Sequence, residues 1–182
     1  MTCVVLGLGS NKSWQGLSSL EILASAVRAL KPLLHDITCS SVYETAPLYV
    51  TNQQAFCNMV VAGYADDSLS PHDLLVQVHR IEASLGRDRS KEIRNGPRSI
   101  DIDIEIFGSE AIHYSDSKDS MKNLEIPHPR LSERAFVLIP LLEILGKSAD
   151  ILDSAPYAQM LSATGSDGVV KILDAETFVK SV

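Results

Sequence analysis

The segment GPRSIDIDIEIF, residues 96–107, alternates isoleucines with acidic residues. Because residues two apart on a β-strand share a face, an extended segment would bury its four isoleucines, up to Ile106, on one side. The other side would carry Asp101, Asp103 and Glu105 in a row. At an effective dielectric constant of about 20, like charges about 7 Å apart repel by about 2 kcal/mol, so the row requires a nearby positive charge.

Basic residues precede this strand. Residues 87–98 contain five arginines or lysines and two acids, a net charge of +3 in a chain whose net charge is −7. Mg2+ prefers one or two carboxylates together with water and phosphate oxygens, and arginines form paired hydrogen bonds with phosphates. Asp101 and Asp103 therefore indicate a metal-dependent nucleotide site, although an acidic strand facing solvent would show the same alternation. Glu105 lies two residues deeper, where we expect it to face solvent or form a salt bridge.

The composition is that of a soluble protein with one packed core. The chain has 182 residues, of which 45% are hydrophobic and 21% charged, and its pI is about 5.1. This acidic balance argues against a nucleic-acid partner. Three widely spaced cysteines argue against a disulfide framework or a zinc site and favour a reducing compartment. No apolar run reaches the roughly 18 residues of a membrane span, and the N-terminal run is too short for a signal peptide. We therefore expect a cytoplasmic protein with no membrane partner.

Hydrophobic periodicity predicts an ordered series of strands and helices. The expected elements are a strand within 3–11 that breaks at Gly7 and Gly9, a helix from Ser18, strands at 37–46 and 54–64, a helix from Ser70 to Gly86, the acid-faced strand, a helix from about Ser132 that bends or restarts at Pro140, and a late strand in SDGVVKILD. The order β-α-β-β-α-β predicts an α+β fold, a ferredoxin-like sandwich with an additional helix and a C-terminal extension.

Two short motifs carry weaker signals. GLGSN lacks the third glycine of a dinucleotide-binding fingerprint, and the chain has no P-loop motif, so Gly7 and Gly9 are interpreted as turn residues. His128 lies between prolines, and an isolated histidine is more often structural or solvated than functional. By residue type alone, Phe56 and Phe136 would belong to the core.

Six segments occur together in the order typical of one enzyme family: GLGSN, SSVYETAPL, FCNMVV, RIEASLGRDR, GPRSIDIDI and IPHPRLSERAFVLIPL. Over residues 3–145 the chain resembles 6-hydroxymethyl-7,8-dihydropterin pyrophosphokinase of folate biosynthesis. The resemblance implies transfer of the terminal pyrophosphate of ATP to the hydroxymethyl group of the pterin, with release of AMP. It also implies a pyrophosphokinase domain at 1–146 and an extension at 147–182 that packs on or continues this domain.

The resemblance also implies a phosphate site. Asp101 and Asp103 would hold two Mg2+ ions that bridge the triphosphate of ATP, and these ions would neutralise the acidic row. Arg87 and Arg98 would grip the phosphates and stabilise them during transfer. The implied catalytic and ATP-binding residues are Arg87, Arg89, Arg98, Asp101, Asp103 and His128.

A pterin site is implied as well. The pterin would stack between the rings of Phe56 and Phe136, and Asn58 would hydrogen-bond its polar edge. The backbone of Thr45 and Leu48 would complete this edge, and Pro47 would stiffen the loop. The implied pterin-binding residues are Thr45, Pro47, Leu48, Phe56, Asn58 and Phe136.

Two positions depart from the family pattern. Phe56 stands where tyrosine is common, and Asn95 stands where tryptophan is frequent. Loops 46–54 and 87–97 are expected to open and close around the substrates. Some relatives are fused to neighbouring folate-pathway enzymes, which makes such enzymes candidate partners.

Two other functions fit part of the pattern. A nucleotidyl transferase or another two-metal phosphotransferase would also place aspartates on such a sheet, but it should show a wider basic surface than one short loop. A non-catalytic pterin- or nucleotide-binding module would have less need for both aspartates and both arginines. Detection of AMP as a product would separate these alternatives.

Overall fold

The computed structural model describes residues 1–47, 52–91, 93, 96–147 and 151–182; Leu48 and Asn95 lie outside the described residues. The strands are β1 (Thr2–Ser10), β2 (His35–Cys39), β3 (Val42–Thr45), β4 (Phe56–Ala65), β5 (Asp101–Phe107), β6 (Ile112–Tyr114), β7 (Leu124–Ile126) and β8 (Val169–Leu173). The helices are α1 (Ser19–Leu30), α2 (Pro71–Ser84), α3 (Ala135–Leu145), α4 (Ala155–Thr164) and α5 (Ala175–Val179), with short 3-10 helices η1 (Ser120–Lys122) and η2 (Leu131–Glu133).

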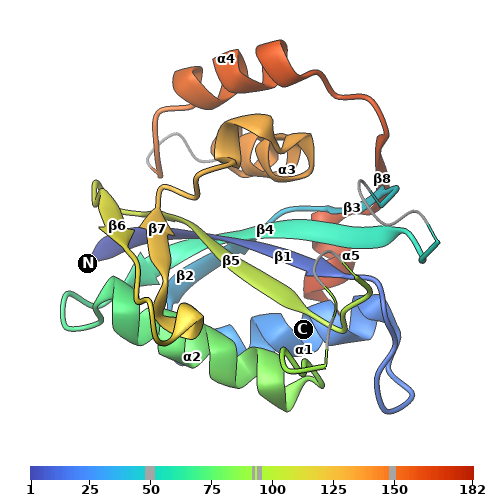
Figure 1. Cartoon of the computed structure of the whole chain (residues 1–182). Coiled ribbons are helices and arrows are strands. Elements are labelled where there is room, and N and C mark those ends of the chain that lie inside the picture. Colours follow the sequence, from blue (N-terminus) through green and yellow to red (C-terminus); the bar gives the residue numbers. More distant parts are fainter. Residues whose placement is uncertain (48–51, 92, 94–95, 148–150) are drawn as a thin grey trace.

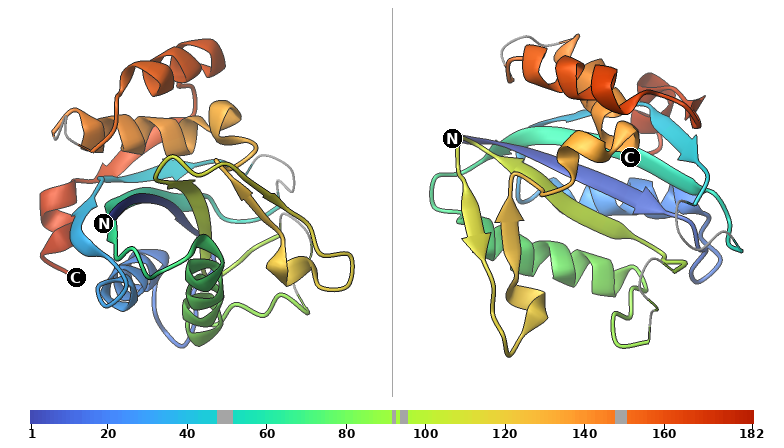
Figure 2. Two further views of the ribbon diagram at one scale, coloured as in Figure 1. Left: turned by 90° about the vertical axis from the view of Figure 1, so that its left-hand side faces the viewer. Right: turned by 45° about the horizontal axis from the view of Figure 1, so that its top comes forward.

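An antiparallel sheet forms the centre of the molecule. Its strand order is β5-β1-β4-β3-β8, with β2 also paired to β4, and β6 and β7 form a separate hairpin. Helices α1 and α2 cover one face of the sheet, whereas α3 covers the other and carries α4 on its outer side (Figures 1 and 2). The prediction of an α+β fold is confirmed, because helices pack on both faces of an antiparallel sheet.

The first two helices begin where their capping residues predict. Ser18 and Glu21 form a reciprocal capping box at the start of α1, and Ser70 caps α2 immediately before Pro71. Their apolar residues, including Leu23 and Leu74, are buried against the sheet. These two helices therefore form one layer of the core.

The predicted turn at Gly7 and Gly9 is wrong. Strand β1 continues through both glycines to Ser10, because β4 and β5 pair with it on either side. The expected strand at 37–46 is interrupted at Ser41, whose backbone N–H donates to the carboxylate of Glu143 at 3.0 Å instead of to a neighbouring strand.

The third helix differs from its prediction in extent. The expected start at Ser132 belongs to η2, and α3 begins only at Ala135. A single helical segment then continues through Pro140 to Leu145, so the alternative that the helix restarts at this proline is wrong.

A β-bulge changes the direction of one isoleucine in β5. Leu6 pairs with Ile104 and Val5 pairs with Ile106, so that Glu105 is an extra residue without a partner of its own on β1. Ile104 packs in the core beneath α1 and α2, whereas Ile106 packs in the core beneath α3. The prediction that all four isoleucines share one face is therefore wrong for Ile106.

The C-terminal segment makes extensive contacts with the rest of the molecule. Strand β8 pairs with β3, and α4 packs on α3. Phe178 of α5 is completely buried in the core beneath the sheet. None of the helices that the structure describes is long and apolar enough to cross a membrane.

Candidate active site

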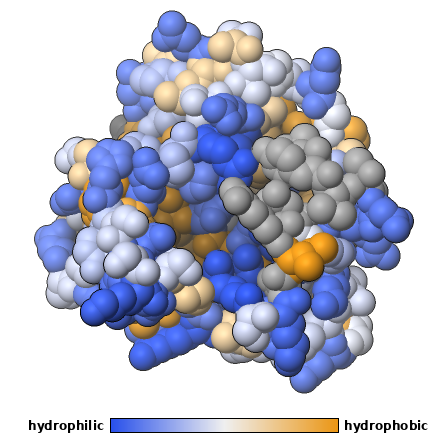
Figure 3. All heavy atoms as spheres, viewed as in Figure 1, coloured by the Kyte–Doolittle hydropathy of each residue, from blue (hydrophilic) through white to orange (hydrophobic). Residues whose placement is uncertain are grey.

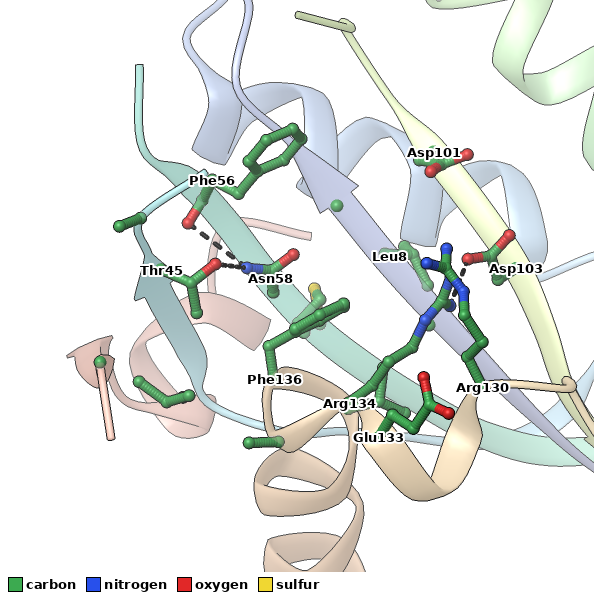
Figure 4. A pocket seen from close by; sticks show the side chains of 18 of the residues that line it. Leu8, Thr45, Phe56, Asn58, Asp101, Asp103, Arg130, Glu133, Arg134 and Phe136 are labelled. Atoms are coloured by element: carbon green, nitrogen blue, oxygen red, sulfur yellow. Dashed lines mark hydrogen bonds and ion pairs between the residues drawn. The ribbon is translucent and has the colours of Figure 1, made fainter. Parts of the chain in front are cut away.

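A cavity of about 380 Å³ lies over the sheet, between strands β5, β1 and β4 and the start of α3 (Figures 3 and 4). Asp101, Asp103 and Glu105 enter it from β5, and Phe136 enters it from α3. In Figure 3, hydrophilic residues lie on both sides of the recess in the middle of this face. The sheet thus presents its acidic residues to the face that α3 covers only in part.

Two glycines of β1 leave room on the floor of this cavity. Gly9 pairs with Asp101 on one side and Asn58 on the other, and Gly7 pairs with Asp103. A Cβ atom on Gly9 would lie 3.0 Å from Oδ1 of Asn58, and one on Gly7 would lie 2.9 Å from Oε1 of Glu105. Glycine at both positions therefore keeps these polar groups unobstructed.

Arginines neutralise the first acid of the row. Nη1 of Arg98 donates to Oδ2 of Asp101 at 2.7 Å, and Nη1 of Arg87 donates to Oδ1 of the same carboxylate. Burial raises the pKa of Asp101, but the charges of Arg87 and Arg98 outweigh this effect and hold the pKa below its ordinary value. Asp101 is therefore an ionised group with two cationic partners.

The second and third acids share one arginine. Nη1 of Arg134 lies 2.7 Å from Oδ2 of Asp103 and 3.2 Å from Oε1 of Glu105. Glu105 is completely buried, and burial together with the charge of Asp103 raises its pKa to about 8. The predicted salt bridge of Glu105 is present, whereas the alternative that it faces solvent is wrong.

Arg87 is buried and does not line the first cavity. Its side chain is only 8% exposed, and Nη1 also donates to Oε1 of Glu82 at 3.0 Å. Glu82 accepts from Nη2 of Arg89 at 2.6 Å and from the backbone N–H of Ile102 at 2.9 Å. A buried carboxylate of α2 therefore holds two of the predicted arginines against β5.

A second cavity, also of about 380 Å³, lies beside the first. Arg89 and His128, which were both predicted to contact ATP, line this cavity. His79, which was not predicted, lines it as well. Burial lowers the pKa of His128, and burial also lowers the pKa of His79 to about 4. Of all the residues that the structure describes, Asp103 alone lines both cavities.

The predicted aromatic residues both line the first cavity. Phe56 and Phe136 are half-buried, and Figure 4 shows them on either side of Asn58. The guanidinium carbon of Arg98 lies 5.4 Å from the centre of the Phe56 ring, and that of Arg134 lies 5.7 Å from the centre of the Phe136 ring. The cavity therefore combines flat apolar surfaces with positive charge.

The amide of Asn58 is held in a fixed orientation. Its side chain is buried, and Nδ2 donates to Oγ1 of Thr45 at 2.8 Å. Thr45 lines the cavity, whereas the half-buried Pro47 does not. Leu48, the remaining predicted pterin residue, is outside the described part of the chain.

Glu82 and Arg134 are absent from the sequence-based predictions. Glu82 follows Ile81 on the apolar side of α2, and an acid among core positions is the signal that could have identified it. Arg134 stands two residues before Phe136, in a segment that the family resemblance included. Neither residue could be matched to its partners without knowing which strand each helix covers.

The donor set fits a magnesium site completed by substrate. Among the residues described, no three His, Cys, Asp or Glu side chains converge to hold a metal by themselves. Mg2+ needs no such cluster, because one or two carboxylates, water and phosphate oxygens satisfy it. Asp101 and Asp103 line the same cavity, and their side chains remain 22% and 34% exposed, which leaves space for these other ligands.

Residues 5–146 match the family described as 7,8-dihydro-6-hydroxymethylpterin-pyrophosphokinase (HPPK). The chain belongs to the HPPK family. It is 41% identical over 146 residues to 2-amino-4-hydroxy-6-hydroxymethyldihydropteridine pyrophosphokinase of Methylorubrum extorquens, a match covering 79% of this chain and 83% of that protein. It is 39% identical over 171 residues to the mitochondrial folate synthesis bifunctional protein of Pisum sativum, covering 93% of this chain but 30% of the pea protein.

The fold also resembles solved HPPK structures. A crystal structure of Plasmodium falciparum HPPK-DHPS superimposes with a TM-score of 0.63 at 16% identity, covering 94% of this chain and 46% of that one. The chain thus spans less than half the length of these bifunctional relatives. Residues 147–182 lie outside the HPPK match, yet Thr164 and Val169 from this segment line the first cavity.

Proposed function

We propose that this protein transfers the terminal pyrophosphate of ATP to the hydroxymethyl group of 6-hydroxymethyl-7,8-dihydropterin and releases AMP, a step of folate biosynthesis. The observation that carries the proposal is the position of Asp103 between the two cavities. One cavity offers aromatic faces and a fixed amide, which suit a flat heterocycle. The other offers Arg89 and His128, which suit a nucleotide.

The first cavity would bind the pterin. Phe56 and Phe136 would cover the two faces of its ring system, and Asn58 would hydrogen-bond its polar edge. Thr45 already fixes the amide of Asn58, so little rotational freedom would be lost on binding. Pro47 and Leu48 complete this proposed subsite, with Leu48 contributing through its backbone.

The arginines would bind the phosphates. Arg98 lies in the wall of the cavity, and its paired donors match phosphate oxygens. Arg87 is buried against Asp101, so we propose that it balances the charge of this carboxylate and reaches phosphate only if the loop after it moves. Arg89 and His128 would contact the nucleotide from the second cavity.

Asp101 and Asp103 would hold two Mg2+ ions. When bound, these ions would neutralise charge on the triphosphate and on the departing AMP. The contribution of the chain is otherwise positioning: the cavities would bring the hydroxymethyl oxygen of the pterin into line with the β-phosphorus of ATP. The proposal assigns no residue as a general base, because orientation and charge neutralisation supply most of the acceleration in phosphoryl transfer.

Three finer assignments belong to the same proposal. The strand order β5-β1-β4-β3 supports a ferredoxin-like core, to which β8 is added. We propose that residues 1–146 form the pyrophosphokinase domain and that 147–182 continue it. The names of the bifunctional plant relatives support neighbouring folate enzymes as partners. A cytoplasmic location stays a prediction from the composition of the chain.

A turnover assay tests this function directly. The protein is incubated with ATP, Mg2+ and 6-hydroxymethyl-7,8-dihydropterin, and nucleotides are separated by chromatography. We expect AMP to accumulate in proportion to pterin consumed, with no free pyrophosphate. Formation of ADP, or AMP formation that does not require the pterin, would contradict the proposal.

A further inference from the structure

Glu105 is a buried carboxylate for which the proposed reaction provides no role. It is completely buried, it lines the first cavity, and its Oε2 atom has no hydrogen-bond partner among the residues that the structure describes. A buried carboxyl group destabilises the fold when one of its oxygens has no hydrogen-bond partner. A buried residue that lowers the stability of the fold in this way is expected to have a function.

The β-bulge determines where this carboxylate lies. Because the register shifts between Val5 and Leu6, Glu105 has no partner of its own on β1, and its side chain lies over Gly7. Its Oε1 atom would be only 2.9 Å from a Cβ atom at that glycine. Bulges commonly redirect a side chain beside an active site, and here the bulge and the glycine together admit Glu105.

The side chain of Glu105 contacts the guanidinium group of Arg134. A single nitrogen, Nη1, lies 3.2 Å from Oε1 of Glu105 and 2.7 Å from Oδ2 of Asp103. The arginine side chain is 12% exposed and lines the same cavity (Figure 4). Of these two carboxylates, Asp103 is the one proposed to bind metal, and a carboxylate that binds metal is a weaker partner for arginine.

We infer that Glu105 is a positioning residue that holds the guanidinium of Arg134 at the cavity wall when Asp103 is engaged by ligand. Arg134 then keeps one carboxyl oxygen of Glu105 as a hydrogen-bond acceptor throughout the reaction and presents its remaining donors to the phosphates. Without Glu105 the guanidinium would lose its orientation as soon as Asp103 changed partner. The inference rests on the proposed function, because it takes the ligand to be a nucleotide with Mg2+.

A double-mutant cycle tests the inference. The variants are Glu105→Leu, Arg134→Ala and the combination of both, and the measurements are kcat and KM for ATP together with calorimetric binding of a non-hydrolysable ATP analogue with Mg2+. We expect Glu105→Leu to reduce kcat/KM and analogue affinity by about tenfold. The double variant should be no worse than Arg134→Ala alone, since Glu105 acts through that arginine. Additive losses, or wild-type values for Glu105→Leu, would overturn the inference.

Thermal unfolding separates positioning from a structural role. We expect Glu105→Leu to unfold close to the wild-type temperature, because Arg134 keeps Asp103 as its counter-charge and the buried Oε2, which lacks a hydrogen-bond partner among the described residues, is removed. Activity that falls only in proportion to lost stability would overturn the inference. The conservative variant Glu105→Gln keeps an acceptor oxygen for Arg134 and should lose less activity than Glu105→Leu. If Glu105→Leu does not fold, the cycle is completed with Glu105→Gln, and additivity there overturns the inference.

Failure of the proposed function would be recognised separately. Wild-type protein that forms no AMP from ATP and pterin contradicts the pyrophosphokinase proposal. The binding cycle with the nucleotide analogue still reports whether Glu105 and Arg134 act as a unit. If Glu105 and Arg134 are coupled in analogue binding but no AMP is formed, the positioning role is supported and the pyrophosphokinase reaction is rejected. If AMP is formed but the two residues are not coupled, the reaction is supported and the positioning role is rejected.

Discussion

The Nη1 atom of Arg87 lies 3.0 Å from Oε1 of Glu82, and the two side chains are only 8% and 1% exposed. This buried ion pair joins α2 to β5, because the same carboxylate accepts from the backbone of Ile102 and the same arginine contacts Asp101. The base of the candidate site is therefore a charged network within the core, and its stability depends on both signs being present.

Replacement of Glu82 should destabilise the fold severely. In Glu82→Leu, Arg87 and Arg89 lose a buried counter-charge, and we expect the free energy of unfolding to fall by about 3–5 kcal/mol. Urea denaturation followed by circular dichroism measures this change. The control is Glu110→Gln at an exposed acid, expected within about 0.5 kcal/mol of the wild type. A similarly small effect for Glu82→Leu would show that the network contributes little.

Loss of the charge on Asp103 should abolish turnover without unfolding the protein. Asp103→Asn keeps the size of the side chain but removes the anion proposed to bind Mg2+, so we expect kcat to fall at least about 100-fold. The unfolding temperature should stay close to that of the wild type, because the side chain is partly exposed. Asp66→Asn, at the opposite end of the sheet, provides the matched control and should retain full activity. Normal turnover by Asp103→Asn would reject the metal assignment.

Removal of one aromatic wall should weaken pterin binding selectively. Phe136→Leu keeps an apolar side chain but loses the flat face, and we expect pterin affinity to fall about threefold to tenfold. Nucleotide affinity should remain within about twofold of the wild type, because Phe136 lines only the first cavity. Calorimetric titrations with each ligand separately give both values. Equal losses for the two ligands would indicate a general disturbance of the site.

Stability should fall in acid through Glu143, which joins α3 to β3. Burial raises the pKa of Glu143, but hydrogen bonds from Lys147, Ser41 and Tyr43 outweigh it and lower the pKa from 4.5 to about 2. A carboxylate with a lowered folded-state pKa contributes its full stabilisation above its unfolded pKa and loses it as the pH falls toward the folded value. The stability difference between wild type and Glu143→Gln should therefore be constant above pH 5 or so and shrink between about pH 4.5 and pH 2. Urea titrations at several pH values test this; a difference that does not change with pH would contradict it.

The C-terminal segment should unfold together with the sheet. Phe178 is completely buried, and Phe178→Ala should lower the free energy of unfolding by about 3–5 kcal/mol in a single cooperative transition. The adjacent Val179 is 52% exposed, so Val179→Ala is a matched control with an expected effect below about 0.5 kcal/mol. A separate early transition in Phe178→Ala would instead show that residues 147–182 fold as an independent unit.

Local patterns in the sequence were sufficient for the features that depend on neighbours along the chain. Alternation placed Asp101 and Asp103 on one face of a strand, and the Ser18 and Ser70 caps marked the starts of the first two helices. These predictions succeeded because strand periodicity and helix capping involve residues within a few positions of one another. The coarse fold class followed from the order of such elements.

Tertiary structure decided the features that depend on pairing between distant segments. The direction of Ile106 and the burial of Glu105 result from a register shift against β1, about 100 residues away in sequence, which no periodicity in β5 alone can reveal. Gly7 and Gly9 became a cavity floor rather than a turn only because strands pair with β1 on both sides. Sequence alone therefore indicated the two aspartates of β5 as candidate groups for the chemistry, whereas Arg134 and Glu82 were identified only in the folded protein. The assembled sheet and its helices determined which arginine faces which carboxylate, because an ion pair is formed by proximity in space rather than along the chain.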